Sequence, residues 1–298
     1  IHDMGFVGSR ASSYALANPM SDENPLLRVH LIPGLIEVAA RNISRGAQDF
    51  AIFEMGSIFR SSKKLETFIS PDTGIRPKDS VITQIFASVP EQTEMVSGLL
   101  VGKKESENWQ GKSSAFAWSD AIAFAQEILE LCHLDFEVKR SDLAPWHPGR
   151  CAAIVVGDSV IGYAGELHPR VVESNGLPAR TCAFEFDFSA LASKANSIVA
   201  AAPVRTFPRA SVDIALVVEP NVNAEAVRAL IQEAAGELLE SVHLFDVYEG
   251  AQIGEGKRSL AYSLEFRAAD RTLTDPEVLA VRDDVIAACA EKFGASIR

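Results

Sequence analysis

At 298 residues, the chain is longer than one hydrophobic core usually organises, which predicts two domains. Its 47% hydrophobic and 23% charged residues are ordinary for a soluble globular protein, and no run approaches the roughly 18 consecutive apolar residues of a membrane span. The net charge of −12 repels phosphate at long range. This argues against nucleic-acid binding driven by non-specific counterion release, so any such contact must be local and depend on shape.

The start of the chain and its cysteines indicate a piece of a larger cytosolic protein. The first residue is Ile1, and residues 1–10 lack the succession of charged, apolar and small residues of a signal peptide. The four cysteines are far apart and form no CxxC pair, which argues against a zinc site or a redox pair. We therefore expect buried, reduced thiols at Cys132, Cys151, Cys182 and Cys289.

A first domain is predicted over residues 1–198, because the small, unpatterned residues 189–203 are typical of a connection between domains. Apolar spacing predicts a helix over 25–42, although Pro33-Gly34 leaves a later start open. Further helices are expected over 120–134 and after His168-Pro169, and strands over 50–60, 151–156, 159–164 and 184–188. The result is a largely antiparallel sheet flanked by helices.

A second domain, residues 199–298, has a simpler order. Strands are predicted over 212–219, 242–248, 259–267 and 295–298, and helices over 224–235 and 276–293. This is the β-α-β-β-α-β order of the ferredoxin-like fold. Thr274-Asp275-Pro276-Glu277 is a strong helix start, since Thr274 or Asp275 can cap and proline is tolerated in the first turn.

Motifs for chemistry are incomplete throughout. Gly111-Lys112-Ser113 and Gly256-Lys257 lack the earlier glycine of a phosphate-binding loop, and no G-x-S-x-G, H-E-x-x-H or G-x-G-x-x-G occurs. No histidine pair has the i, i+4 spacing of a helical metal site. His147 and His168, which each precede a proline, are expected near one another in capping or turn roles. The sequence therefore predicts no catalytic residue and no metal ligand.

The strand over 259–267 has two unlike faces. Its apolar face needs a cover of helices, whereas Ser259, Ala261 and Ser263 make the other face small and polar. Basic residues flank this open face, and small side chains permit a base to approach closely. From the pattern alone, an ordinary solvated face is the favoured interpretation, and nucleic-acid contact is the alternative.

A series of short motifs spans nearly the whole chain and resembles the bacterial phenylalanyl-tRNA synthetase β subunit. The series comprises Asn18-Pro19-Met20-Ser21-Asp22-Glu23, Leu27-Arg28, Leu31-Ile32-Pro33-Gly34-Leu35, Arg41-Asn42, Phe53-Glu54-Met55-Gly56, His147-Pro148-Gly149-Arg150, Gly165-Glu166-Leu167-His168-Pro169, Phe245-Asp246-Val247-Tyr248-Glu249-Gly250 and Arg271-Thr272-Leu273-Thr274-Asp275.

The resemblance implies an α+β chain in which a non-catalytic class II synthetase-like module precedes a ferredoxin-fold anticodon-binding domain. Phe59-Arg60-Ser61-Ser62 lacks the glutamate of an active class II motif, which agrees with lost catalysis. The implied partners are the α subunit, in an (αβ)2 heterotetramer, and phenylalanine tRNA, with no membrane or DNA partner. The implied location is the cytoplasm. No cofactor is expected in this chain, because the full enzyme would bind ATP and magnesium elsewhere.

The resemblance favours tRNA contact over a solvated face in the second domain. In relatives, a basic pair often precedes the aspartate of the first strand, whereas Ser211-Val212 precedes Asp213 in this sequence. Two other interpretations stay open: a free-standing enzyme with an unrecognised site, and a protein-interaction module with an acidic surface. The residues predicted to contact tRNA are Arg205, Arg209, Lys257, Arg258, Ser259, Ser263, Arg267 and Arg271.

Overall fold

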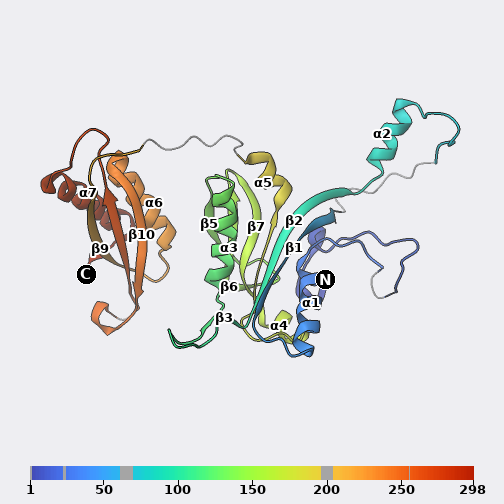
Figure 1. Ribbon diagram of the computed structural model, residues 1–298, viewed down its shortest axis with the longest axis horizontal. Helices are drawn as coiled ribbons and strands as arrows, with labels where there is room; N and C mark the ends of the chain where they lie inside the picture. The colour runs from blue at the N-terminus through green and yellow to red at the C-terminus, as the bar shows by residue number, and fades with distance from the viewer. Residues whose placement is uncertain (1, 23–24, 61–69, 196–203, 255) are drawn as a thin grey trace. The chain divides into compact units, whose positions relative to one another are not determined.

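The computed structural model describes residues 2–22, 25–60, 70–195, 204–254 and 256–298. The chain divides into two compact units, Ile1–Val199 and Ala200–Arg298, each with its own sheet (Figure 1). The domain boundary predicted between residues 198 and 199 lies within 196–203, outside the described residues. In the parts of the chain that the structure describes, no helix is long and apolar enough to span a membrane.

The first unit is built on a six-stranded sheet in which every neighbouring pair is antiparallel. This confirms the predicted antiparallel sheet. A separate two-stranded ribbon joins β3 (Lys103–Glu105) to β4 (Ser114–Ala115). In spatial order, the six strands are β1 (Phe50–Arg60), β2 (Glu91–Val101), β8 (Cys182–Asp187), β7 (Ser159–Leu167), β6 (Trp146–Val156) and β5 (Glu137–Ser141).

Helices cover both faces of this sheet (Figure 1). On one face, α1 (Ile32–Ser44) and α4 (Pro169–Ser174) pack in a core that includes Ala183 of β8. On the other, α3 (Trp118–Leu131) and α5 (Phe188–Lys194) pack against Phe184 and Phe186. Strand β8 thus lies between two cores, because successive side chains of a strand point to opposite faces.

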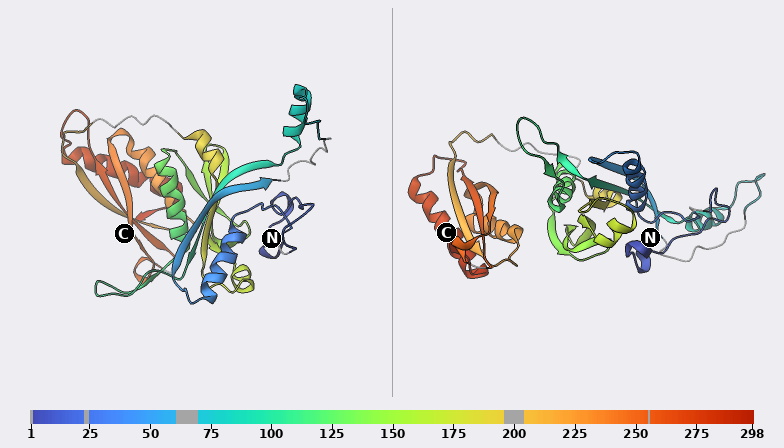
Figure 2. Two further views of the ribbon diagram at one scale, coloured as in Figure 1. Left: turned by 45° about the vertical axis from the view of Figure 1, so that its right-hand side comes forward. Right: turned by 90° about the horizontal axis from the view of Figure 1, so that it is seen from below.

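Several parts of the first unit differ from the sequence expectations. The helix predicted from Pro25 begins at Ile32, which confirms the later start that Pro33-Gly34 left open. Residues 189–203 were predicted as an unpatterned connection, but helix α5 occupies the start of this stretch, because Leu191 is buried against the sheet and Asp187 caps the helix. Helix α2 (Asp79–Ala87) and strands β2, β3, β4 and β5 were not predicted. Helix α2 has no buried residue and extends with the ends of β1 and β2 beyond the rest of the unit (Figures 1 and 2).

The second unit confirms the predicted β-α-β-β-α-β order, with a sheet in the order β10-β11-β9-β12. The side chains of Leu260, Tyr262, Leu264 and Phe266 are fully buried against α6 and α7, as the apolar face of the strand predicted. The elements are β9 (Ala210–Val218), α6 (Ala224–Ala235), β10 (Leu239–Tyr248), β11 (Arg258–Phe266), α7 (Asp275–Phe293) and β12 (Ser296–Ile297), with short 3-10 turns at His2–Met4 and Gly8–Arg10 in the first unit and Gly236–Leu238 and Ala251–Ile253 in the second.

The start of α7 shows the predicted cap. The Thr274 N–H donates to the Glu277 carboxylate at 2.9 Å, and the Thr274 hydroxyl donates to it at 2.8 Å. Together with Arg271, these donors hold the pKa of the Glu277 carboxyl at about 2. At the other end, Gly294 adopts a positive φ of 63°, a conformation that favours glycine after a helix.

Candidate nucleic-acid interface

Among the described residues of the second unit, α6 and α7 pack in the core on one face of the sheet, and small side chains run across the middle of the other face. The register places Ala261 of β11 opposite Ala215 of β9, and Ser263 opposite Asp213. On the other flank, His243 of β10 lies opposite Ser263. A planar ligand can therefore approach the backbone closely between taller side chains at the two edges.

Phe245 lies beside this row of small residues, at an irregularity in β10. Leu244 pairs with Tyr262 and Asp246 with Ala261, so Phe245 is an extra residue between them. Such a bulge re-aims a side chain, and the ring of Phe245 is 53% exposed. It borders a cavity of about 450 Å³ whose lining includes Asp213, Ala215, Ala261, Ile297 and Arg298.

The end of the face near Tyr248 is covered by the chain itself. The Arg298 guanidinium lies over the Tyr248 ring at 4.6 Å, and it donates to Gln252 Oε1 at 3.3 Å. Ser259, predicted as an open contact residue, is only 2% exposed there. Ala261 is also buried, at 8% exposed, so the accessible part of the face is the part around Phe245 and Ser263.

The predicted basic residues do not form one cluster. Lys257 and Arg258 lie at the start of β11, whereas Arg267 and Arg271 follow its end. Eight strand residues lie between Arg258 and Arg267, and these nine steps correspond to roughly 30 Å at about 3.3 Å per residue. The structure thus places cations at two opposite ends of the face.

Most of these cations are paired with acids. At the end near Glu265, Arg209 donates to both of its carboxylate oxygens, at 2.8 and 3.0 Å. Hydrogen bonds from Ser241 and then from Arg209 lower the pKa of Glu265. Arg267 forms an ion pair with Glu240 (Nε–Oε2 3.0 Å), and its guanidinium also donates to the Arg205 carbonyl at 3.1 Å.

The remaining four cations have partners too. Arg205 donates to the Arg267 carbonyl at 3.1 Å, and Arg271 pairs with Asp270 and Glu277. Lys257 lies 4.0 Å from Glu219. Arg258 shares the register of the buried Leu260, and its guanidinium donates to the Val222 carbonyl, so this side chain is held on the helix side of the sheet. The sequence analysis did not identify Phe245, Asp213 or Arg298 as site residues. For Phe245, the two adjacent apolar residues Leu244 and Phe245 were the available signal of a bulge.

In the first unit, the two prolyl-preceding histidines do lie together. The rings of His147 and His168 stack with centroids 6.4 Å apart. His147 Nδ1 accepts from the Gly149 N–H at 3.0 Å, and His168 Nδ1 accepts from the Arg170 N–H at 3.2 Å at the start of α4. The predicted proximity and the capping and turn roles are confirmed.

The family models match in two segments that agree with the two units. Residues 206–298 match the ferredoxin-fold anticodon binding domain, the class of fold that the β10-β11-β9-β12 sheet and its two helices define. Residues 4–188 match the phenylalanyl tRNA synthetase beta chain CLM domain. The chain belongs to the phenylalanyl-tRNA synthetase beta chain family.

Curated relatives carry the same name. The chain is 44% identical over 292 residues to the phenylalanine–tRNA ligase beta subunit of Cutibacterium acnes, and 44% identical over 287 residues to that of Streptomyces avermitilis. The matches cover 97% and 95% of this chain but 34% of each relative, so the chain spans about a third of their length. A solved pyrrolysyl-tRNA synthetase from Desulfitobacterium hafniense aligns with 15% identity and a TM-score of 0.41 over 64% of this chain and 57% of that chain, a similarity too low to establish a shared fold.

Proposed function

We propose that this chain works as part of phenylalanine–tRNA ligase, in which its second unit binds the anticodon region of phenylalanine tRNA. The observation that carries the proposal is the small-residue face beside the exposed ring of Phe245, within a unit that matches the anticodon-binding family. Single-stranded bases are commonly recognised by stacking on aromatic rings together with hydrogen bonds to their edges. Phe245 supplies the ring, and Asp213 and Ser263 supply polar groups on the adjoining strands.

The charges of the second unit favour this local mode of binding. Residues 199–298 carry 10 basic and 16 acidic side chains, and the predicted basic contacts largely face carboxylates. Binding through many phosphates would require free cations and would depend steeply on salt. We therefore propose that base stacking contributes most of the affinity of this surface, and that the basic residues position the backbone of the loop.

For the first unit, we propose a scaffolding role. The motif features of an active class II site are absent from the sequence around Phe59-Arg60, so activation of phenylalanine is assigned to the α subunit in a cytoplasmic (αβ)2 assembly. ATP and magnesium are bound there, and this chain contributes no cofactor site to that reaction. Binding energy spent on the anticodon end positions the acceptor end of the tRNA for chemistry in the α subunit.

The test replaces Phe245 in the chain assembled with its α subunit. Stacking on an aromatic ring contributes about 1–3 kcal/mol per base, so Phe245→Ala is expected to weaken phenylalanine tRNA binding between about fivefold and 150-fold, and Phe245→Tyr to retain it. Val247→Ala is the matched control, because Val247 lies on the same strand and is 51% exposed but shares the register of the helix-facing Leu260.

Binding is measured by fluorescence anisotropy, with phenylalanine tRNA and with the same tRNA carrying altered anticodon bases. Wild-type protein should discriminate between the two tRNAs, and Phe245→Ala should lose that discrimination. If Phe245→Ala and Val247→Ala bind alike, the open face is not the contact surface. The chain without its α subunit should show no phenylalanine-dependent exchange of pyrophosphate into ATP; exchange by the purified chain would support a free-standing enzyme instead.

A further inference from the structure

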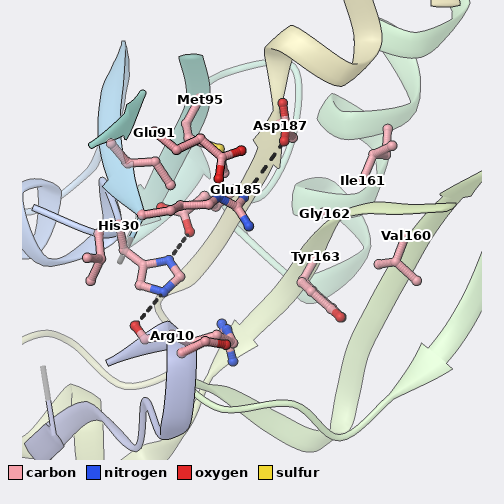
Figure 3. A pocket seen from close by; sticks show the side chains of 14 residues that line it. Arg10, His30, Glu91, Met95, Val160, Ile161, Gly162, Tyr163, Glu185 and Asp187 are labelled. Atoms are coloured by element: carbon pink, nitrogen blue, oxygen red, sulfur yellow. Dashed lines mark hydrogen bonds and ion pairs between the residues drawn. The ribbon is translucent and has the colours of Figure 1, made fainter. Parts of the chain in front are cut away.

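A second cavity lies in the first unit, lined by residues that include Arg10, Tyr163 and Glu185 (Figure 3). Its volume is about 470 Å³, which is within the range of small-molecule sites. Buried apolar side chains form part of its wall, among them Ile58, Met95 and Ile161, which are 2%, 5% and 4% exposed. Charged side chains complete the wall, so the cavity combines an apolar surface with fixed charges.

Glu185 faces this cavity but is fully engaged in holding the fold together. One carboxylate oxygen accepts from the backbone N–H groups of Leu31 and Ile32 at 2.7 and 3.2 Å. The other lies 2.6 Å from His30 Nδ1, and His30 Nε2 lies 3.1 Å from the Arg10 carbonyl. Because a carbonyl can only accept, Nε2 donates to Arg10. Both carboxylate oxygens of Glu185 are thereby occupied by partners within the unit.

Arg10, in contrast, is held in place with donors to spare. Its Nη1 donates to the Ala144 carbonyl at 2.6 Å, and its guanidinium lies over the rings of Phe6 at 4.9 Å and Tyr163 at 5.8 Å. Within the described part of the chain, its Nη1 contact with Ala144 is the hydrogen bond of this side chain. A stacked guanidinium is already ordered, so an anion that it binds costs little further side-chain entropy.

A second guanidinium adds positive charge at the same cavity. Arg60 Nη2 lies 3.7 Å from Asp187 Oδ2, which is too long for a hydrogen bond, while Asp187 Oδ1 accepts from the Ala190 N–H at 2.8 Å. Burial lowers the pKa of Arg10 most, the charge of Glu185 opposes this, and the charge of Arg60 lowers the pKa further. An anion bound beside Arg10 would compensate both the burial of its guanidinium and the repulsion between Arg10 and Arg60.

Of the three acidic residues in the cavity wall, Glu185 is close enough for its charge to raise the pKa of Arg10, whereas the other two stand away from it. Figure 3 shows Glu91 and Asp187 on one side of the cavity and Arg10 on the other, with Tyr163 next to it. We propose that this cavity binds a small organic anion, with its carboxylate or phosphate held by Arg10 and its apolar part against Ile58, Met95 and Ile161. This site is separate from the sheet face of the second unit and takes a ligand of a different kind.

The four methionines allow a direct test, because Met95 alone of Met4, Met20, Met55 and Met95 lines the cavity. With methyl-labelled methionine, titration of the 298-residue chain with benzoate or phenyl phosphate should shift the Met95 signal and leave that of the fully exposed Met20 unchanged. Met95→Leu assigns the signal. Benzylamine, which has the same ring and a positive charge, should cause no shift. The stronger of the two anions identifies carboxylate or phosphate as the preferred group.

Single substitutions distinguish anion binding in the cavity from a general effect of the charge of the chain. Arg10→Gln should weaken benzoate binding about tenfold or more, since a charge-assisted hydrogen bond is lost. Arg60→Gln, at a half-exposed site, should weaken it less and keeps the test valid if Arg10→Gln does not fold. Arg76→Gln is the matched control, because Arg76 is exposed and pairs with Asp79 outside the cavity.

Specific outcomes would overturn the proposal. These are a Met95 signal that no anion moves in the folded chain, an equal response to benzylamine, or unchanged affinity in both Arg10→Gln and Arg60→Gln. A response to inorganic phosphate equal to that for phenyl phosphate would remove the apolar contact from the proposal. Phe245→Ala should leave these titrations unchanged, so failure of the anion site and failure of the anticodon interface are distinguishable.

Discussion

Glu185 connects parts of the first unit that are far apart in the sequence, and its removal should be costly. Its carboxylate is 4% exposed and accepts from Leu31, Ile32 and His30, more than 150 residues away. Glu185→Ala removes the partner of two buried backbone N–H groups and of the Nδ1 atom of His30. Each buried unsatisfied group costs about 1–3 kcal/mol, and removing one partner of a buried ion pair costs about 3–5 kcal/mol. We expect Glu185→Ala to lower the free energy of unfolding of this unit by about 3–5 kcal/mol.

Glu185→Gln separates the contribution of the charge from that of the hydrogen bonds. Its amide oxygen can still accept from the two N–H groups at the start of α1, so we expect a loss of only about 1–2 kcal/mol. All three tryptophans, Trp109, Trp118 and Trp146, belong to the first unit, so their fluorescence during urea unfolding reports on this unit alone. Equal effects of the two substitutions, or a loss below about 1 kcal/mol for Glu185→Ala, would refute this account of the link between α1 and β8.

Three other properties can be measured directly. Burial raises the pKa of the Cys151 and Cys182 thiols to about 12 and Cys289 is also buried, so a thiol reagent at mildly alkaline pH should modify the partly exposed Cys132 first and all four cysteines only after unfolding. The pKa of the Glu277 carboxyl is depressed to about 2, so its contribution to stability is complete above the pKa of the unfolded state and is lost as the pH falls towards 2. NMR titration of the carboxyl should show the depressed pKa, and Glu277→Gln should flatten the dependence of stability on acid pH. Because the basic residues of the open face are mostly paired, the affinity for phenylalanine tRNA should fall only shallowly with salt, and a slope equivalent to six or more phosphates would contradict the stacking account.

The second unit could be predicted closely because its local signals agree with its tertiary structure. Strand β11 alternates between Leu260, Tyr262 and Leu264 on the core side and smaller residues on the other, and the cap at Thr274 fixes the start of α7. Each element is therefore marked by its own residues. Topology followed from the order of these elements without knowledge of any long-range contact.

The first unit was harder to predict because several of its elements depend on partners far away in sequence. Strand β2 is central, and residues Met95 to Val101 are buried on both faces, so the alternation that marks a half-exposed strand is absent. The start of α1 at Ile32 is fixed by Glu185 rather than by a neighbouring cap. Neither feature can be read from residues within one turn or one strand.

The candidate site was likewise predictable where local pattern decides and not where distant partners decide. The small face of β11 followed from alternation, whereas the exposure of Phe245 depends on a bulge in β10 that only the pairing with Tyr262 and Ala261 defines. For the basic residues, residue type gives charge but not availability. Arg209 meets Glu265 and Arg267 meets Glu240 across strands or loops, and Arg258 turns to the Val222 carbonyl.

These pairings change the physical argument about how an acidic unit can hold RNA. An arginine already bound to a carboxylate must exchange that partner for a phosphate, so its net contribution to affinity is smaller than that of a free cation. An exposed aromatic ring over small side chains has no such competing partner, and burying it against a base removes apolar surface from water. In the proposed interface, the residue types that first suggest a tRNA contact are therefore not those expected to contribute most to it, and the main contribution is expected from Phe245 rather than from the arginines.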